Sequence, residues 1–397
     1  MKRTKPFEVN NFNSHKKLII YGASVYGEIA RAALSHFNIV PDFFCDKSTK
    51  RDSYFSISVI TPERLLEIEN VNIIIASADF FYEIRDMLIS MGFEEIYDMS
   101  KLLKTEFDVS GLSNRAKEVY ANREYYLNIV SSQIDNRIVL NRIQYVVTEK
   151  CTLRCKDCSH LMPYYRHPKD VNLLKSKKAF DLLLDHVDYI AELRILGGEP
   201  FINSDIYDLI EEYKNSLKIQ SISIYTNGTI IPNEKKLVAL RHKNVKVHIS
   251  DYQVNHESIQ KLKNVFDKYQ IHYFVRIYDE WQNAGDTSYR GYSIEQIQKH
   301  FSTCFERNGY TFLHGKLYRC PRSAHGMNLK AMPDSPDNYI DLENWNGTSE
   351  ELKCRIIDLQ NLKYLESCKY CSGPDNHEQG IPAAIQTTEF MEYKKFL

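Results

Sequence analysis

Residues 142–158 read RIQYVVTEKCTLRCKDC, an apolar run that leads directly into three cysteines. The run at 142–148 has the length and β-branched content of a strand. Further strands are expected at 192–196, 220–225, 245–250 and 272–278, with helices at 176–190, 204–216, 233–241 and 256–269. This alternation predicts parallel strands that form a barrel or part of one. In such folds the chemistry lies at the carboxyl ends of the strands, where the cysteines also fall.

A second alternating pattern precedes this region. Strands are expected at 17–21, 40–46, 71–76 and 94–97, with helices after residue 25 and at 80–91. The pattern predicts a doubly wound parallel sheet that resembles a Rossmann domain. The predicted fold class is therefore α/β, with four segments along the chain. They are a Rossmann-like parallel-sheet domain over 14–105, a helical linker over 106–141, a partial (β/α)6 TIM-like barrel over 142–300 and a small Cys-rich extension over 301–397.

Charge and composition exclude several classes of protein. The 397 residues carry 51 Lys and Arg against 52 Asp and Glu, a formal net charge of -1, which argues against a nucleic-acid partner or membrane-surface binding. No apolar run is long enough to span a membrane, and the basic N-terminus lacks the apolar stretch of a secretory signal. Nine cysteines without an export signal indicate reduced thiols and a cytoplasmic protein.

The three central cysteines have metal-binding spacing. Cys151, Cys155 and Cys158 form a C-x3-C-x2-C group. Three thiolates on one loop can bind three irons of a 4Fe–4S cluster and leave the fourth iron for a small molecule. A structural zinc ion needs four ligands, and His160 is cramped as a fourth because it follows Cys158 so closely. Zinc remains the alternative interpretation.

Polar or glycine-rich residues end or directly follow the next three predicted strands. Two glycines allow a ligand to approach the backbone closely, and a neighbouring carboxylate can accept hydrogen bonds from an ammonium group. Each segment also has a purely structural interpretation, as an ordinary βα turn or an Asn-Gly turn. The residues are Gly197, Gly198, Glu199, Thr226, Asn227 and Ser250.

The three-cysteine motif, the Gly-Gly-Glu-Pro motif at 197–200 and their order on successive strands resemble the radical S-adenosylmethionine (SAM) superfamily over residues 142–280. The resemblance implies that the three cysteines hold a 4Fe–4S cluster whose open iron is chelated by the amino and carboxylate groups of SAM. It places Gly197, Gly198 and Glu199 along the methionine moiety. Thr226, Asn227 and Ser250 are expected near the sulfonium, carboxylate or ribose. The family usually has an aromatic residue where this chain has Asp157, which bears on adenine packing rather than on the cluster.

The same resemblance implies the chemistry. One electron from the cluster would cleave SAM to methionine and a 5′-deoxyadenosyl radical, which takes a hydrogen atom from the substrate. The electron requires a low-potential donor such as flavodoxin or ferredoxin. No residue of this sequence is assigned as a catalytic acid, base or radical donor.

Four further cysteines lie near the C-terminus: Cys304, Cys320, Cys368 and Cys371. Four thiolates suit zinc or an iron–sulfur cluster. The C-x10-G-x4-C spacing followed by C-x2-C resembles the twitch form of the SPASM extensions found on radical SAM enzymes, which implies an auxiliary 4Fe–4S cluster and hence two clusters in all. Cys45 and Cys354 fit no ligand position, and we expect both to be packed core thiols.

The N-terminal segment carries a variant of the dinucleotide-binding fingerprint. Gly22, Ser24 and Gly27 follow the first strand, and Asp46 ends the second, where it could bind a ribose hydroxyl. A structural turn with a solvent-facing Asp46 is the alternative. The pattern resembles small domains fused to bacterial enzymes that modify nucleotide-sugars and capsules.

These features lead to a preferred substrate and two alternatives. We expect a small molecule, namely a sugar, cyclitol or nucleotide-sugar, that is oxidised or epimerised at carbon. The alternatives are a radical SAM enzyme that modifies a peptide during maturation, and a metal-stabilised binding protein without catalysis. Arg194, Tyr252, Arg276 and Tyr278 are expected near the barrel mouth, where either arginine could clamp a phosphate or form an ion pair in the wall.

Overall fold

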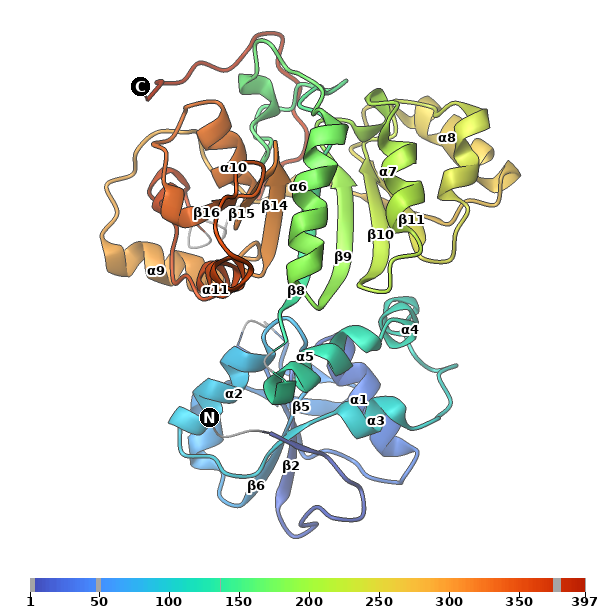
Figure 1. Cartoon of the computed structure of the whole chain (residues 1–397). Coiled ribbons are helices and arrows are strands. Elements are labelled where there is room, and N and C mark those ends of the chain that lie inside the picture. The colour runs from blue at the N-terminus through green and yellow to red at the C-terminus, as the bar shows by residue number, and fades with distance from the viewer. Residues whose placement is uncertain (1–3, 48–50, 136, 374–379, 397) are drawn as a thin grey trace. The chain divides into compact units, whose positions relative to one another are not determined.

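The computed structural model describes residues 4–47, 51–135, 137–373 and 380–396 (Figure 1). The chain divides into two compact units, residues 1–137 and 138–397, and each is described by itself. Among the described residues, no helix combines the length and the apolar character that a membrane crossing requires.

The first unit is built on a seven-stranded sheet in the order β1-β7-β6-β2-β3-β5-β4. β2 lies in the middle, pairs in parallel with β3 and β6, and is buried from Leu18 onward, as expected for a strand covered on both faces. The strands are β1 (Lys5–Pro6), β2 (Lys17–Tyr21), β3 (Phe43–Cys45), β4 (Ser53–Tyr54), β5 (Ile57–Ile60), β6 (Val71–Ile75) and β7 (Ile96–Asp98). This order, in which the chain moves to one side of β2 and then to the other, is that of a doubly wound sheet.

Helices of the first unit are α1 (Val25–Ser35), α2 (Phe81–Ser90), α3 (Ser100–Lys104), α4 (Asn114–Ala121) and α5 (Glu124–Asp135), with a 3-10 helix η1 (Glu63–Glu67). α4 begins at a capped N-terminus, because the Ser113 side chain accepts a hydrogen bond from the Ala116 N–H. Buried Glu28 of α1 in turn accepts hydrogen bonds from the Ser113 N–H and hydroxyl, at 2.6 and 2.8 Å. This contact fixes α4 against α1.

The second unit is built on an eight-stranded sheet in the order β12-β11-β10-β9-β8-β14-β15-β16. The pairings from β12 to β14 are parallel, which confirms the predicted α/β partial barrel. The strands are β8 (Val139–Val146), β9 (Tyr189–Leu196), β10 (Ile219–Thr226), β11 (Val245–Asp251), β12 (Tyr273–Ile277), β14 (Gly309–Leu313), β15 (Lys316–Tyr318) and β16 (Tyr339–Asp341). A separate two-stranded sheet pairs β13 (Glu280–Trp281) with β17 (Ile381–Pro382).

The helices of this unit are α6 (Leu173–His186), α7 (Ile206–Tyr213), α8 (His256–Lys268), α9 (Ile294–Thr303), α10 (Pro321–Asn328) and α11 (Ser349–Gln360). Short 3-10 helices are η2 (Met162–Tyr164), η3 (Pro200–Ile202), η4 (Glu234–Leu240), η5 (Pro336–Asn338) and η6 (Glu366–Tyr370). The segment 233–241, expected to be an α-helix, is the 3-10 helix η4. A 3-10 helix rises about 2.0 Å per residue instead of 1.5 Å, so these residues span a longer return path from β10 toward β11.

The sheet of the second unit continues past residue 300. β14 pairs in parallel with β8, from Gly309 opposite Arg142 to Phe312 opposite Tyr145. A hairpin turns at His314-Gly315: β14 and β15 are antiparallel, and these two residues have positive φ values of 47° and 72°. The division of the chain at residue 300 stays a prediction.

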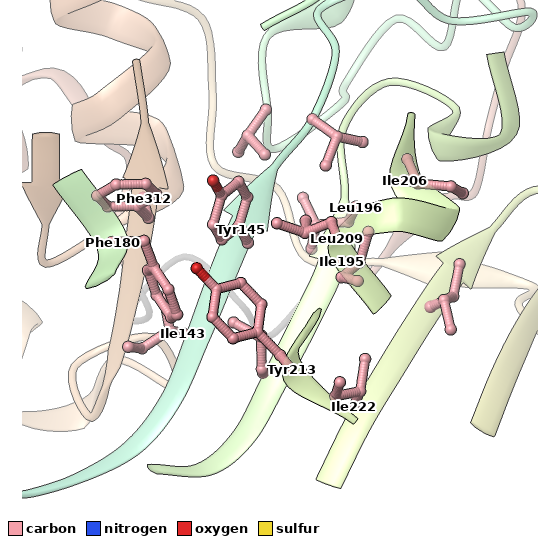
Figure 2. Close-up of a cluster of buried hydrophobic side chains, with 14 of the residues drawn as sticks. Ile143, Tyr145, Phe180, Ile195, Leu196, Ile206, Leu209, Tyr213, Ile222 and Phe312 are labelled. Atoms are coloured by element: carbon pink, nitrogen blue, oxygen red, sulfur yellow. The ribbon is translucent and has the colours of Figure 1, made fainter. Parts of the chain in front are cut away.

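The main core lies between this sheet and helices α6 and α7 (Figures 1 and 2). Phe180 of α6 is fully buried, and its ring centroid is 5.1 Å from that of Tyr145 and 5.3 Å from those of Tyr213 and Phe312. The Tyr145 hydroxyl donates to the Ser176 hydroxyl at 3.0 Å, so its polar end is satisfied inside the core. This packing holds β8, the strand that leads into the cysteines, against α6.

Replacing Phe180 with alanine should therefore destabilise the second unit. A cavity at a fully buried phenylalanine typically lowers the free energy of unfolding by about 3–5 kcal/mol. Leu174→Ala is the matched control on the same helix, because Leu174 is 73% exposed. Urea unfolding followed by circular dichroism measures both, and equal stabilities for the two variants would contradict this account of the core.

Candidate functional site

The three central cysteines lie together on the loop that follows β8. The thiols lie close together, because Cys155 and Cys158 both raise the pKa of Cys151, and Cys158 raises that of Cys155. Cys151 and Cys158 also pack against a small apolar cluster whose buried members include Leu161, Tyr164 and Tyr165. The structure thus brings together the residues that the motif predicts as cluster ligands.

Each of the three sulfur atoms accepts a hydrogen bond from an N–H group. The Leu153 N–H points at Cys151 Sγ, with a nitrogen–sulfur distance of 3.4 Å. The side-chain amide of Gln386 donates to Cys155 Sγ at 3.1 Å. Backbone N–H groups of residues 160–162 face Cys158, helped by the left-handed backbone of Leu161. Such donors stabilise a thiolate and are a common feature of iron–sulfur sites.

Burial acts on these thiols in the opposite direction. It raises the pKa of Cys151 to about 12 and that of Cys155 to about 11, and it raises the pKa of Cys158 as well. A metal would have to displace the protons of such thiols, so metal loading should depend on pH. Three shielded sulfur atoms, each with an N–H donor, fit three ligands of a 4Fe–4S cluster.

Within the described ranges, no three His, Cys, Asp or Glu side chains are arranged to hold a single metal ion. A 4Fe–4S cluster binds each thiolate to a different iron, so its ligands lie farther apart than those of one ion.

The Gly-Gly-Glu segment after β9 pairs with the residues that enter the cysteine loop. The Gly198 N–H donates to the Thr148 carbonyl at 3.0 Å, and the Glu199 N–H donates to the Lys150 carbonyl at 2.8 Å. A Cβ on Gly197 would lie 2.3 Å from the Thr148 oxygen, and one on Gly198 would lie 2.2 Å from the Lys150 oxygen. The space beside both glycines is thus occupied by the chain itself, and their position along a bound methionine stays a prediction.

Glu199 is fully buried and connects the ends of β9 and β10. Its carboxylate accepts hydrogen bonds from the Thr226 hydroxyl and the Asn227 N–H, both at 2.8 Å, and from the Phe201 N–H at 3.2 Å. Burial raises its pKa to about 7 in spite of these donors. The sequence motif predicts a carboxylate for an ammonium group, and the structure shows one already engaged in holding two strand ends together.

Asn227 and Ser250 lie at the ends of the next two strands. The Asn227 side-chain amide donates to the Thr152 hydroxyl at 3.1 Å and approaches Cys151 Sγ at 3.7 Å, which ties β10 to the cysteine loop. Ser250 is 8% exposed at the end of β11. Tyr252, two residues further on, is half-buried near Cys155 and Cys158, and loss of solvent around its hydroxyl raises its pKa.

Charged side chains line the sheet face opposite α6 and α7. Leu193 and Ile195 face the core, so Glu192 and Arg194, which alternate with them, point to the other side. Arg194 forms an ion pair with Glu192 at 2.7 Å and lies over the Tyr225 ring, whereas Arg276 is exposed and lies over Tyr278. Arg194 is thus a paired wall residue.

The four C-terminal cysteines also lie together. Cys304 directly follows α9, Cys320 directly precedes α10, and Cys368 and Cys371 lie in and directly after η6. Their thiols influence one another electrostatically, and burial raises the pKa of Cys304 to about 11 and of Cys368 to about 12. Four converging thiols fit an auxiliary cluster, and the identity of the metal stays a prediction.

The two remaining cysteines differ from each other. Cys45 is fully buried in β3, as expected. The expectation for Cys354 is wrong, because this residue is exposed on α11. The apolar face of α11 consists of Leu352, Ile356 and Leu359, and Cys354 falls outside that stripe.

The fingerprint residues of the first unit contact one another. Asp46 accepts a hydrogen bond from the Ala23 N–H at 2.9 Å, inside the loop that joins β2 to α1. A Cβ on Gly27 would lie 2.0 Å from the Gly22 oxygen, so close packing of that turn requires the glycine. Ser24 is the N-cap residue of α1. Nucleotide binding by these residues stays a prediction.

Two features of the site escape sequence reasoning. Gln386 is separated from Cys155 by 231 positions, and no motif marks it. Arg322, which is buried beside the Cys320 end of α10, lies near enough to Cys158 for its charge to lower that thiol's pKa. A buried arginine between two cysteine groups carries no local signal in the sequence.

Residues 145–288 match the family described as the Radical SAM superfamily. The chain contains a radical SAM domain. The matched range includes the three-cysteine loop and the ends of β9, β10 and β11. This family implies a 4Fe–4S cluster and SAM as cofactors of the domain.

Curated relatives of the radical SAM domain are GTP 3′,8-cyclases. The protein from Campylobacter jejuni subsp. doylei is 29% identical over 128 residues, which cover 30% of this chain and 38% of that protein. The one from Aliarcobacter butzleri is 32% identical over 126 residues, covering 31% and 38%. A Caenorhabditis elegans molybdenum cofactor biosynthesis protein, moc-5, is 30% identical over 125 residues, covering 31% and 20%. The chain thus spans less than half the length of these relatives.

Solved structures similar to this chain include two further proteins. BtrN in complex with AdoMet and 2-DOIA is 16% identical, with a TM-score of 0.35, and covers 60% of this chain and 94% of its own. Streptococcus suis SuiB bound to the precursor peptide SuiA is 19% identical, with a TM-score of 0.28. The match covers 60% of this chain and 53% of the SuiB chain.

Protonation of Glu199 should be visible in the stability of the iron-free protein. A carboxyl group whose pKa is raised in the folded state stabilises the fold fully below its unfolded pKa of about 4.5 and loses that contribution as pH rises through about 7. Between pH 4.5 and 8, wild type should lose roughly 3 kcal/mol of unfolding free energy relative to Glu199→Gln. Urea unfolding at several pH values measures the difference.

Glu149→Gln provides a control of opposite sign. Burial raises the pKa of Glu149, but hydrogen bonds from His314, the Lys169 N–H and Asn328 outweigh it and hold the pKa below its usual value. Wild type should therefore gain stability relative to this variant as pH rises through the acid range. A pH-independent difference for Glu199→Gln would contradict the raised pKa.

Proposed function

We propose that this protein is an enzyme that cleaves SAM reductively at a 4Fe–4S cluster held by Cys151, Cys155 and Cys158. The observation that carries the proposal is the loop after β8, where three shielded thiols with N–H donors lie beside the Gly-Gly-Glu segment in the family-matched range. When bound, the cluster would give one electron to the sulfonium of SAM and so supply the 5′-deoxyadenosyl radical that removes a hydrogen atom from the substrate.

The chain's own residues would bind and orient SAM. Gly197, Gly198 and Glu199 would follow the methionine moiety, with the Glu199 carboxylate toward its ammonium group. Thr226, Asn227 and Ser250 would lie near the sulfonium, carboxylate or ribose. Support comes from their positions at the ends of β9, β10 and β11, on the side where the cysteine loop lies. Burial of Glu199, Thr226, Asn227 and Ser250 would help to exclude water from the radical.

We further propose an auxiliary 4Fe–4S cluster at Cys304, Cys320, Cys368 and Cys371. Because a protein thiolate would occupy the ligand position on each of its four irons, this cluster would relay electrons rather than bind substrate. Its support is the convergence of the four thiols between α9, α10 and η6. A low-potential flavodoxin or ferredoxin is the proposed electron source.

The preferred substrate is a sugar, cyclitol or nucleotide-sugar, oxidised or epimerised at carbon. Support comes from the doubly wound sheet of the first unit, whose β2–α1 turn lies where such sheets bind nucleotides and carries a variant of the fingerprint with Ser24 in place of the middle glycine. A purine nucleoside triphosphate is a second candidate, because the curated relatives of the radical SAM domain are GTP 3′,8-cyclases. Peptide modification remains the alternative predicted from sequence.

Cysteine variants should separate the two proposed clusters. Cys151→Ala, Cys155→Ala and Cys158→Ala should each abolish SAM cleavage, because each removes a ligand of the reducing cluster. Cys368→Ala should lower the iron content by about half, while the signal that changes on SAM addition should persist. Cys354→Ala is the control, because this exposed cysteine belongs to neither group. Iron and sulfide analysis with EPR measures the outcome; zinc in both sites without SAM cleavage would favour a metal-stabilised binding protein.

A substrate panel should discriminate the proposed substrate classes. Reconstituted, dithionite-reduced enzyme is incubated with SAM and with sugars, cyclitols, nucleotide-sugars, purine nucleoside triphosphates or peptides. Formation of 5′-deoxyadenosine should rise at least several-fold above the substrate-free background with a sugar-type compound. Stimulation only by nucleoside triphosphates, or only by peptides, would replace the sugar proposal with the corresponding alternative.

A further inference from the structure

The C-terminal segment, residues 381–396, runs beside the three-cysteine loop. Figure 1 shows it in red next to the green loop that follows β8. The Lys156 N–H donates to the Ile385 carbonyl, and the Thr387 N–H donates to the Arg154 carbonyl, both at 2.8 Å. These bonds flank a bridge between Cys155 and Gln386, so the segment adds one strand-like contact to the loop.

Contacts on both sides fix this segment in place. At one end β17 pairs with β13. At the other, the Met391 N–H donates to the Pro163 carbonyl at 3.0 Å, and the Phe396 N–H donates to the Lys330 carbonyl at 2.7 Å. The Arg154 guanidinium also lies 4.3 Å from the centre of the Phe390 ring.

Gln386 uses both ends of its side-chain amide on the cysteine loop. Its oxygen accepts a hydrogen bond from the Arg154 N–H at 2.8 Å, and its nitrogen donates to Cys155 Sγ at 3.1 Å. Cys155 is only 7% exposed, although Lys156 beside it is exposed. The amide thus orients the backbone before Cys155 and supplies the donor that the sulfur receives.

An N–H donor on a cluster thiolate has a direct redox consequence. Reduction adds one negative charge to the cluster, so a donor stabilises the reduced form more than the oxidised form. Loss of the donor therefore makes the reduction potential more negative. The same bond also holds the ligand in position, which is the usual task of groups that contact metal ligands.

We propose that Gln386 is a positioning residue that sets the reduction potential of the three-cysteine cluster through its hydrogen bond to Cys155. This inference rests on the proposed cluster at Cys151, Cys155 and Cys158. The C-terminal segment then belongs to the SAM-cleaving site, although it lies outside the matched range 145–288.

The test is the midpoint potential of the cluster in the reconstituted full-length protein. The EPR signal that changes when SAM is added identifies the cluster with an open iron. Titration with dithionite, followed by the same signal, gives the midpoint potential of that cluster. Gln386→Leu removes all three hydrogen bonds of the amide, which are the two to the cysteine loop and one that the amide nitrogen donates to the Ala384 carbonyl at 2.7 Å. Gln386→Glu keeps an acceptor for the Arg154 N–H but removes the donor to sulfur. Thr388→Val is the matched control, because residue 388 contacts Arg154 through its backbone carbonyl.

Both Gln386 variants should show about a tenfold lower equilibrium constant for one-electron reduction, a shift of ~59 mV to more negative potential. Thr388→Val should keep the wild-type potential. Unchanged potentials in both Gln386 variants, or iron loss without a shift, would overturn the inference and leave the proposed function standing. A wild-type protein without any SAM-responsive signal would instead overturn the proposed function, and the inference with it.

Discussion

The backbone pairing of residues 197–199 with residues 148–150 is the contact on which the site depends. It continues the β8–β9 ladder beyond both strands and requires glycine at 197 and 198, because any side chain would overlap a carbonyl oxygen. Glu199 then extends the connection to the end of β10. The Asn227 side chain donates a hydrogen bond to Thr152 and so connects the end of β10 to the cysteine loop. Three strand ends and the cysteine loop are therefore fixed as one hydrogen-bonded assembly.

The two faces of the sheet explain how the barrel can be both stable and reactive. Parallel sheets are normally covered on both faces, and α6 and α7 cover one with an aromatic and aliphatic core (Figure 2). The other face carries ion pairs such as Arg194 with Glu192 and Arg142 with Glu306. Pairing lowers the cost of placing these charges where little water reaches them. The site can thus be polar without weakening the core behind it.

The last quarter of the chain reaches back to the cysteine loop in two places. Cys320 is the N-cap residue of α10, and the helix places buried Arg322 near Cys158, so one short helix contacts both groups of cysteines. The C-terminal segment supplies Gln386 to Cys155. Arg322 and Cys155 are both buried, where a single charge or hydrogen bond has a larger effect than in water, although Gln386 itself is exposed.

Much of the fold follows from local patterns in the sequence. The alternation of apolar runs and helical stretches predicts the parallel sheet, because burial on both faces demands such runs. Cys151, Cys155 and Cys158 share a loop for the simple reason that only seven positions separate the first from the last. The exposure of Cys354 could not be predicted from the sequence, because it depends on which face of α11 packs against the sheet. The 3-10 form of η4 could not be predicted either, because it depends on the path that the chain takes between β10 and β11.

Contacts between residues that are far apart in the sequence could not be predicted from such local patterns. The motif at 197–200 marks Glu199 as a chemical group, but its burial and its three donors arise only when β9 and β10 lie side by side. Gln386 meets Cys155 across 231 positions, and Arg322 approaches Cys158 from another helix. Spacing along the chain encodes neither meeting, because hydrogen bonds and charges act through space, and folding alone determines which distant residues come within their range.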